Sequence, residues 1–267
     1  MDESRRSFLK EAGLAALGVG CGFPLLGAAC GTSGRQTAGA ASPSIQWGMV
    51  IDVEKCLSEE VRRACIEACH RVHNVPDIPE EEDEVKWIWS EEYRHVFPDE
   101  VHAHTAAETG EAPILVLCNH CAQPSCVRVC PTGATWKSEL DGIVMMDMHR
   151  CIGCRYCIAA CPYGARSFNW KDPRPYIARD EAGSFLSDYP TRSKGVVEKC
   201  NFCDERLRFG IEPACVEAAR LVPGGEGALT FGDVTDPASE VSRILRERHT
   251  IVRRVGLGTS PNVFYIV

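Results

Sequence analysis

The sequence has few of the features that mark a catalytic or a nucleic-acid-binding protein. Aromatic residues make up only 7% of its 267 residues, and acidic residues outnumber basic ones by 37 to 29. A formal net charge of -8 disfavours a nucleic-acid surface, which needs clustered Lys and Arg. The sequence also has no glycine-rich phosphate loop, no nucleophile–base constellation and no Cys-x-x-Cys-His haem motif. Independent catalysis is therefore not expected.

Long hydrophobic runs are missing after the first forty residues. No stretch there approaches the ~18–20 apolar residues that a membrane-spanning helix needs. Any contact with a membrane is therefore expected to come through a partner protein. The few aromatic residues, set against 23 glycines and 16 prolines, suggest that inorganic cofactors replace part of a hydrophobic core.

Cysteine is what the sequence has in excess, with 16 residues. Two runs are complete, each with three closely spaced cysteines, a fourth cysteine and a proline. They are Cys118, Cys121, Cys126 and Cys130 with Pro131, and Cys151, Cys154, Cys157 and Cys161 with Pro162. Such runs bind 4Fe–4S clusters, and the fourth cysteine of each run ligates the cluster of the other run. The pattern therefore predicts a protein that carries electrons.

Two further runs are incomplete. Their cysteines are Cys56, Cys65 and Cys69 in the first run and Cys200, Cys203 and Cys215 in the second. In the second run Ala219 stands where the fourth cysteine is expected, so the exchange rule assigns Cys69 to this site. The first run lacks its second cysteine and has a stretched first gap, which leaves Cys56 and Cys65 without further ligands.

The exchange rule thus predicts three complete ligand sets and one vacated site. Set A is Cys118, Cys121, Cys126 and Cys161; set B is Cys130, Cys151, Cys154 and Cys157; set C is Cys69, Cys200, Cys203 and Cys215. We expect one 4Fe–4S cluster on each set, with these twelve cysteines as the iron ligands. Cys56 and Cys65 are expected to remain as remnants or to form a disulfide. Alternatively Glu59 or a water completes the fourth site, although a carboxylate is a hard ligand for a thiolate site.

The first forty residues predict an export signal. Residues 4–10 read SRRSFLK, a twin-arginine motif, and a weakly apolar stretch rich in Gly and Ala follows over residues 12–29. The twin-arginine route exports folded proteins, which suits a protein that receives its clusters before export. We therefore expect a periplasmic protein, cleaved after Ala40 or, alternatively, lipidated at Cys30. The tight, regular cysteine spacing favours clusters over the disulfides that are otherwise common in exported proteins.

The order of the runs predicts an α+β fold of two interlocked ferredoxin-like units with loop-rich insertions. Residues 45–109 and 195–267 form an outer, discontinuous unit, because the first and last runs must meet to share ligands. Residues 110–194 form the inner unit and a connecting excursion. Strands are expected over residues 44–53, 114–117, 142–146, 228–234 and 263–267, and helices over residues 61–73 and 237–246.

Three histidines lie next to cysteines of the runs. His120, between two cysteines of set A, is expected to be a spacer that hydrogen-bonds nearby, because set A is already complete. His70 and His149 are expected to be exposed, although charge near a cluster could tune its potential.

The acidic segment after residue 79 has two interpretations. The run Glu80–Glu84 is a solvated loop or a docking edge for a basic partner. Further on, His95, His102 and His104 could form a metal site or a pH-sensitive edge, or could lie in an acidic loop. The aromatic residues after the acidic run are expected to pack locally.

The residues around the cysteines resemble the iron–sulfur subunits of the dimethyl sulfoxide, polysulfide and nitrite reductase type. The matching segments are residues 117–121, 130–134, 151–157, 199–203, 213–218 and 231–234. The resemblance covers roughly residues 45–267 and implies electron transfer without a catalytic site. The twin-arginine leader, the stretched first run and Ala219 are similar, more narrowly, to the DsrO-type subunits of the DsrMKJOP membrane complexes of dissimilatory sulfur metabolism.

This resemblance also implies partners. In relatives with a molybdenum subunit, the cluster that matches the Cys56/Cys65 site faces that subunit, so its loss disfavours a molybdoenzyme. Set B matches the cluster nearest the membrane partner. The implied partners are a DsrP-like integral membrane subunit that interacts with quinone and a DsrJ-like multihaem cytochrome c. The alternatives are the electron-transfer subunit of an exported molybdopterin oxidoreductase, or a scaffold whose clusters only hold the fold.

Overall fold

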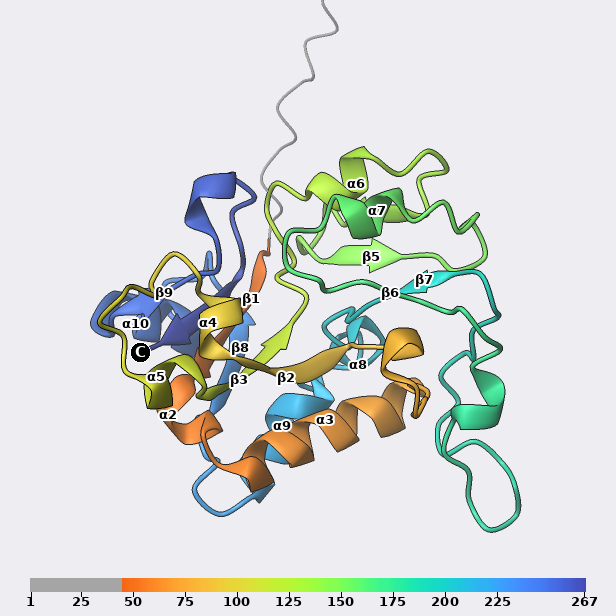
Figure 1. The fold of residues 1–267 in the computed structure, drawn as a ribbon, viewed down its shortest axis with the longest axis horizontal. Coiled ribbons are helices and arrows are strands. Elements are labelled where there is room, and N and C mark those ends of the chain that lie inside the picture. The colour runs from red at the N-terminus through yellow and green to blue at the C-terminus, as the bar shows by residue number, and fades with distance from the viewer. Residues whose placement is uncertain (1–44) are drawn as a thin grey trace, which may run out of the picture. The chain divides into compact units, whose positions relative to one another are not determined.

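The computed structural model describes residues 45–267 as a mixed α/β fold in which short strands and helices are joined by long loops (Figure 1). The predicted twin-arginine motif, the cleavage and lipidation sites and Cys21 lie outside the described residues. Among residues 45–267, no helix has the length and apolar character needed to cross a membrane.

The largest sheet joins the two ends of the described chain. Its four strands have the order β8-β1-β10-β9. β1 (Trp47–Asp52) pairs in parallel with β10 (Val263–Ile266) and antiparallel with β8 (Leu229–Asp233), while β9 (Thr250–Ile251) extends the sheet beside β10. Segments that are about 200 residues apart in the sequence therefore form one sheet.

β1 is buried on both faces because each face meets a different core. Successive side chains of a strand point to opposite faces. Met49 and Ile51 enter the main hydrophobic core, whereas Val50 packs with Val241 and Ile266 in a smaller core. Val241 belongs to α10 (Glu240–Glu247), which covers this second face of the sheet.

The caps of α10 and of the long helix α3 explain where these helices begin and end. Ser239 precedes α10, and its side-chain Oγ accepts a hydrogen bond from the Ser242 N–H at 3.1 Å. α3 (Glu59–His73) ends at Asn74, whose backbone is left-handed (φ 49°) and whose N–H donates to the His70 carbonyl. The expected helices over 61–73 and 237–246 are thus confirmed, with small differences at their ends.

α3 packs against α9 (Ala214–Leu221), and this contact brings the first and last cysteine runs together. Cys65, Cys69 and His73 follow one another at intervals of four residues on the buried side of α3. α9 presents Cys215, Val216 and Ala219 as buried residues.

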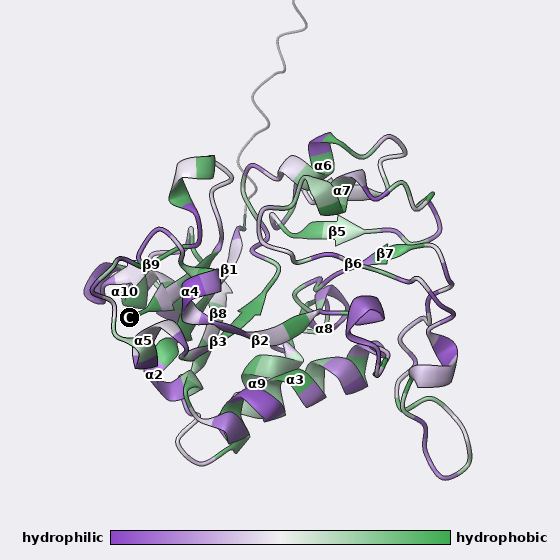
Figure 2. Cartoon of the chain, in the orientation of Figure 1, coloured by the Kyte–Doolittle hydropathy of each residue, from purple (hydrophilic) through white to green (hydrophobic). Residues whose placement is uncertain are grey.

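A second ladder was not expected from the sequence. β2 (Ile88–Glu92) pairs antiparallel with β3 (Pro113–Leu117), with Trp89 opposite Val116. The buried strand over residues 114–117 was predicted, and Figure 2 shows β3 as a strongly hydrophobic strand. Its partner was interpreted only as a segment of local aromatic packing, because Trp and Glu mix along it without clear alternation. The expected local packing holds for Tyr93 and Phe97, which contact each other, whereas Trp87 stacks on His73 and meets Tyr189 edge-on.

The cysteine-rich middle of the chain consists of small elements around loops. β4 (Thr135–Lys137) and β5 (Val144–Met146) form one hairpin, and β6 (Ser167–Phe168) pairs with β7 (Val197–Glu198). The remaining short helices are α2 (Val53–Cys56), α4 (Tyr93–Val96), α5 (Ala107–Gly110), α6 (Ser125–Arg128), α7 (Tyr156–Ala159) and α8 (Asp204–Leu207). Single 3-10 turns lie at Glu81–Asp83, Arg174–Tyr176 and Val255–Leu257. Helices this short depend on tertiary contacts for their stability.

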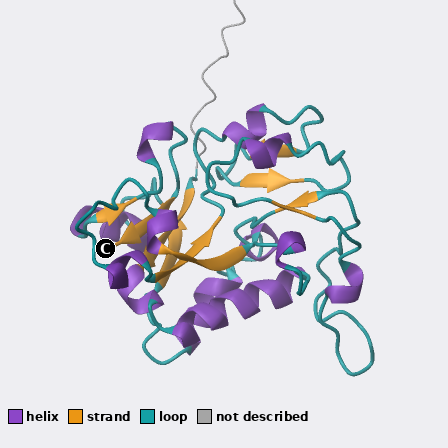
Figure 3. Cartoon of the chain, in the orientation of Figure 1, coloured by secondary structure: helices purple, strands orange, loops and turns teal. Residues whose placement is uncertain are grey.

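Residues 172–194 form the irregular excursion that the sequence predicted. Apart from the turn at Arg174–Tyr176 and one isolated bridge between Arg179 and Phe185, this segment is loop, drawn in teal in Figure 3. The division into an outer and an inner unit stays a prediction. The β2–β3 and β6–β7 ladders both cross its boundaries, so the two predicted units share backbone hydrogen bonds.

Candidate metal centres

The four cysteines of set C come together in the core. Cys69 lies on α3, Cys215 lies on α9, and Cys200 and Cys203 lie on the loop before α8. Each of them is at most 8% exposed. Burial raises the pKa of the Cys69 thiol well above its usual value, and the neighbouring thiols of Cys200, Cys203 and Cys215 raise it further. Thiols that oppose one another's ionisation in this way lie near one another, so the fold gathers the four cysteines in one buried region.

The cysteines of set A gather at the end of β3. Cys118 follows that strand directly, and Cys126 lies on α6. Burial raises the pKa of Cys121 to about 12, and the neighbouring thiols of Cys118, Cys126 and Cys161 contribute in the same direction. Cys161, the fourth cysteine of the other complete run, therefore lies beside the first three cysteines of this run.

Set B lies nearest to solvent. Cys130, Cys151, Cys154 and Cys157 line a single cavity together with Met146 and Val197. Cys154 is exposed, whereas every cysteine of set C is buried. The loop of this set packs tightly: Gly153 has a left-handed φ of 70°, and a Cβ atom there would collide with the Gly195 carbonyl oxygen. Glycine is thus required for the loop to pass so close to the backbone.

Backbone N–H groups point at cysteine sulfur in two of the sets. The N–H of Phe202 donates to Cys200 Sγ at 3.4 Å, and the N–H of Val197 donates to Cys151 Sγ at 3.5 Å. Hydrogen bonds to the sulfurs are among the factors that set the potential of an iron–sulfur cluster. Groups of four thiols with such donors fit 4Fe–4S clusters in their chemistry. The assignment of the twelve ligands and the number of clusters stay predictions.

The three sets form a series in which set A is the middle member. Burial raises the pKa of Cys157 in set B, and the thiol of Cys126 in set A raises it further. Burial also raises the pKa of Cys200 in set C, and the thiol of Cys118 in set A adds to this shift. Set A thus borders both other sets, and the order is B–A–C.

Cys56 and Cys65, at the predicted vacated site, are buried free thiols. Cys56 Sγ lies 3.8 Å from the Ala228 carbonyl oxygen, and Cys65 Sγ lies 3.4 Å from the Cys215 carbonyl oxygen. Burial raises the pKa of both thiols to about 12. Cys65 borders set C through the Cys215 backbone. The choice between remnant thiols and a disulfide stays a prediction.

These two thiols belong to the main hydrophobic cluster, and the charged side chains of Asp52, Arg62 and Lys55 also act on Cys56. Val61 and Ala219 are buried in the same hydrophobic cluster as Cys56 and Cys65. Glu59, the alternative ligand, is exposed at the start of α3. The exposed position of Glu59 disfavours it as the ligand that completes a fourth centre.

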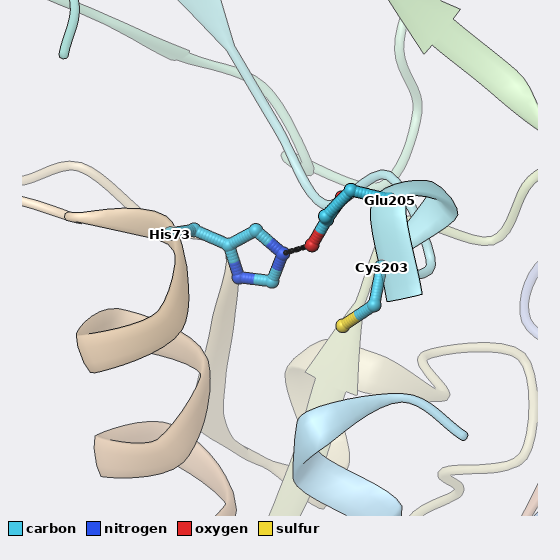
Figure 4. A group of neighbouring side chains, drawn as sticks. All are labelled: His73, Cys203 and Glu205. Carbon is cyan, nitrogen blue, oxygen red and sulfur yellow. Dashed lines mark ion pairs between the residues drawn. The ribbon is translucent and has the colours of Figure 1, made fainter. Parts of the chain in front are cut away.

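One residue that the sequence analysis missed lies against set C. His73 Nδ1 is 3.0 Å from the Cys69 carbonyl oxygen, and His73 Nε2 is 2.8 Å from Glu205 Oε1 (Figure 4). Among the described residues, the only group of three or more His, Cys, Asp or Glu ligand atoms that gathers within 4.8 Å is His73, Cys203 and Glu205. Because Cys203 belongs to set C, we interpret His73 and Glu205 as neighbours of that set rather than as a separate metal site. The sequence held one signal that could have identified His73: it follows Cys69 by four residues, which is one helical turn.

The histidines next to cysteines differ in their environments. His120 is fully buried, its Nδ1 accepts a hydrogen bond from the Val144 N–H at 3.1 Å, and its ring stacks on Phe202. Its predicted role as a hydrogen-bonded spacer is confirmed. The expected exposure of His70 is wrong: this side chain is half-buried, and burial lowers its pKa. His149 is exposed, as expected.

The acidic segment is partly neutralised within the chain. Lys171 Nζ lies 3.2 Å from Glu80 and 2.8 Å from Asp83, so the acidic run is held against the excursion. His95 pairs with Glu91 at 2.9 Å, and the exposed rings of His102 and His104 are 6.1 Å apart. In the part of the chain that the structure describes, these histidines form no three-ligand metal group.

Comparisons with known proteins agree with this arrangement. The family description "4Fe-4S dicluster domain" matches residues 114–175, which contain all the cysteines of sets A and B. The "Hdr-like menaquinol oxidoreductase iron-sulfur subunit 1" of Archaeoglobus fulgidus is 40% identical over 98% of this chain and 97% of its own length. The "Menaquinone reductase, iron-sulfur cluster-binding subunit" of Nitratidesulfovibrio vulgaris is 36% identical over 83% and 89%. A putative iron–sulfur subunit of a dimethyl sulfoxide reductase from Halobacterium salinarum is 37% identical over 82% and 78%.

Proposed function

The chain belongs to the family of iron–sulfur electron-transfer subunits that includes those of the menaquinol oxidoreductase and menaquinone reductase named above, and we propose that it is the exported relay subunit of a quinone-linked membrane complex. The observation that carries the proposal is the series B–A–C, in which thiols of neighbouring sets lie within electrostatic reach of one another. Bound at these sets, 4Fe–4S clusters take up and release single electrons.

The two ends of this relay differ in their exposure to solvent. Set C is enclosed by α3, α9 and the loop before α8, which exclude water from its sulfurs. Set B opens to the surface at Cys154, and Ile152 and Tyr156 beside it are 66% and 63% exposed. Exposed apolar residues around the most accessible set favour this face as the contact with the membrane partner.

The finer assignment rests on the sequence pattern and on the names of the relatives. We propose three clusters on sets A, B and C, export by the twin-arginine route, and association with the periplasmic side of the membrane through the complex. The partners would be a DsrP-like quinone-interacting membrane subunit and a DsrJ-like multihaem cytochrome c in dissimilatory sulfur metabolism, which makes the chain DsrO-like. Quinone-linked names among the relatives support the first partner.

A second candidate is the electron-transfer subunit of an exported molybdopterin oxidoreductase. The relative named as part of a dimethyl sulfoxide reductase favours it. The predicted loss of ligands at the Cys56/Cys65 site disfavours it, because the family resemblance places this site against a molybdenum subunit. Copurification with a large molybdenum-containing chain would support this candidate and exclude the first.

The deciding experiment is the iron and acid-labile sulfide content of anaerobically purified protein. About 12 iron atoms per chain, four for each of three sets, would support the three-cluster relay. About 16 would mean that Cys56 and Cys65 recruit further ligands, and would favour the molybdopterin candidate. Clusters that no quinol or haem protein can reduce or oxidise would instead indicate a scaffold.

A further inference from the structure

Two of the buried cations that have no carboxylate partner, Arg166 and Lys199, contact cysteines of the sets. Arg166 is 5% exposed and Lys199 is 1% exposed. Among the described residues, neither side chain forms an ion pair with an Asp or a Glu, whereas the buried Arg192 pairs with Glu198. A buried charge is strongly unfavourable unless an opposite charge lies nearby. The anions available to Arg166 and Lys199 are those of the cysteine sets.

Arg166 lies at the junction of sets A and B. Its Nη2 donates to Cys126 Sγ at 3.1 Å and to Thr135 Oγ1 at 2.8 Å, so the guanidinium is held in one orientation. Burial alone would lower the pKa of Arg166, but the thiols of Cys126 and Cys157 raise it. One of these cysteines belongs to set A and the other to set B, and the direct hydrogen bond goes to set A.

Lys199 lies beside set C. Its Nζ donates to the Cys200 carbonyl oxygen at 2.6 Å and to the Val144 carbonyl oxygen. Burial raises the pKa of the Cys200 thiol, and Lys199 is one of the groups that lower it again. The ammonium group is therefore fixed beside the first cysteine of set C by two backbone oxygens.

A cluster with its four thiolates is negatively charged, and each electron that it accepts makes it more so. A fixed cation in a dry environment stabilises the reduced form more than the oxidised form. We propose that Arg166 and Lys199 are positioning residues of the relay, which raise the reduction potentials of the clusters on sets A and C, respectively. This inference rests on the proposed three-cluster function and adds the residues that tune it.

The test is an anaerobic potentiometric titration of the full-length, cluster-loaded protein, followed by electron paramagnetic resonance. Signals are assigned first by their loss in Cys130→Ala for set B and Cys69→Ala for set C. Arg166→Gln removes the charge but keeps hydrogen-bond donors. At a fixed ambient potential it should lower the reduced-to-oxidised ratio on set A about tenfold, which corresponds to about 59 mV for a one-electron couple. Lys199→Gln should do the same on set C and leave set B unchanged.

The chain offers a matched control. Arg150 directly precedes Cys151, as Lys199 directly precedes Cys200, but it is 68% exposed and pairs with Asp147 at 3.3 Å. Because solvent and a carboxylate already screen its charge, Arg150→Gln should leave all ratios within about twofold. Arg166→Lys keeps the charge and should retain most of the wild-type potential.

Three outcomes would overturn the inference. One is that Arg166→Gln and Lys199→Gln move the ratios no more than Arg150→Gln does. Another is that Arg166→Lys shifts set A as far as Arg166→Gln does, which would point to a geometric role. If Arg166→Gln fails to retain iron, Lys199→Gln decides, and an unchanged ratio on set C then rejects the proposal. Absence of clusters from the wild-type protein would instead reject the proposed function.

Discussion

Cys65 and Cys69 lie one turn apart on the same helix, are both buried, and yet have different surroundings. Cys69 lies near the thiols of Cys200, Cys203 and Cys215, whereas Cys65 lies near the thiols of Cys56 and Cys215, with its Sγ 3.4 Å from the Cys215 carbonyl oxygen. The helix therefore does not decide which cysteine is a candidate ligand. The segments that pack against each turn of α3 decide it, and these come from the far end of the sequence.

The comparison can be tested most strongly by removing each thiol in turn. Cys69→Ala should lose one whole cluster, about four iron atoms per chain, and should destabilise the fold, because metal binding and folding are coupled in such units. Cys65→Ala and Cys56→Ala are the matched controls, because both thiols are buried but neither is a predicted ligand. Both substitutions should change the iron content little. The measurements are iron per chain and the thermal unfolding midpoint. Equal iron loss in Cys69→Ala and Cys56→Ala would refute the exchange of ligands.

A second prediction concerns the packing at the vacated site. Val61 is fully buried on α3 in the same cluster as Cys65. Val61→Ala should leave a small cavity and cost about 1–3 kcal/mol of stability, without any change in iron content. The thermal unfolding midpoint and the iron content measure the two effects separately. Iron lost in proportion to stability would show that this region does contribute to a centre.

The smallest expected effect is that of pH on the stability of the fold. It concerns two histidines beside cysteines, the buried His120 and the exposed His149. Burial lowers the pKa of His120 well below its usual value, and the cations Lys199 and Arg166 lower it further. The unfolded chain takes up a proton at this histidine below about pH 6.5, whereas the folded protein does not. This histidine therefore costs no stability above that pH, and the protein loses stability as the pH falls below it, by up to about 1.4 kcal/mol per unit.

His120→Gln should remove this part of the acid sensitivity, and the exposed His149 supplies the control. The measurement is the unfolding midpoint at about pH 5, about pH 6 and about pH 7.5, values that span the unperturbed histidine pKa. His149→Gln should follow the wild-type pH profile. If His120→Gln follows it too, the acid sensitivity comes from other groups.

The candidate site could be predicted from the sequence to the extent that it is local. Spacings within each run identify triplets of cysteines, because a cluster is wrapped by a short loop whose length is set by the geometry of the cube. Strands over 114–117 and 228–234, and the helix over 61–73, also follow from local patterns. β2 could not be predicted in this way, since its mixed residues form a strand only when paired with β3.

Residues that act across the fold were not visible in the sequence. Lys199 and Arg150 occupy the same position relative to a cysteine run, but one is buried and the other is exposed. His73 and Glu205 meet only because the end of α3 lies beside the start of α8. The expected exposure of His70 was wrong because the burial of this side chain depends on the packing around α3, which the residues next to Cys69 do not show.

The sequence by itself determined the kind of chemistry, since cysteine spacing within a run is a local property that only a few metal groups fit. Only the tertiary structure decided the environment of each thiol. Burial, neighbouring charge and the order B–A–C all depend on contacts between segments that are far apart in the chain. Residues of one type at equivalent positions can therefore differ in charge environment, because desolvation depends on what packs around a side chain and not on its neighbours in sequence.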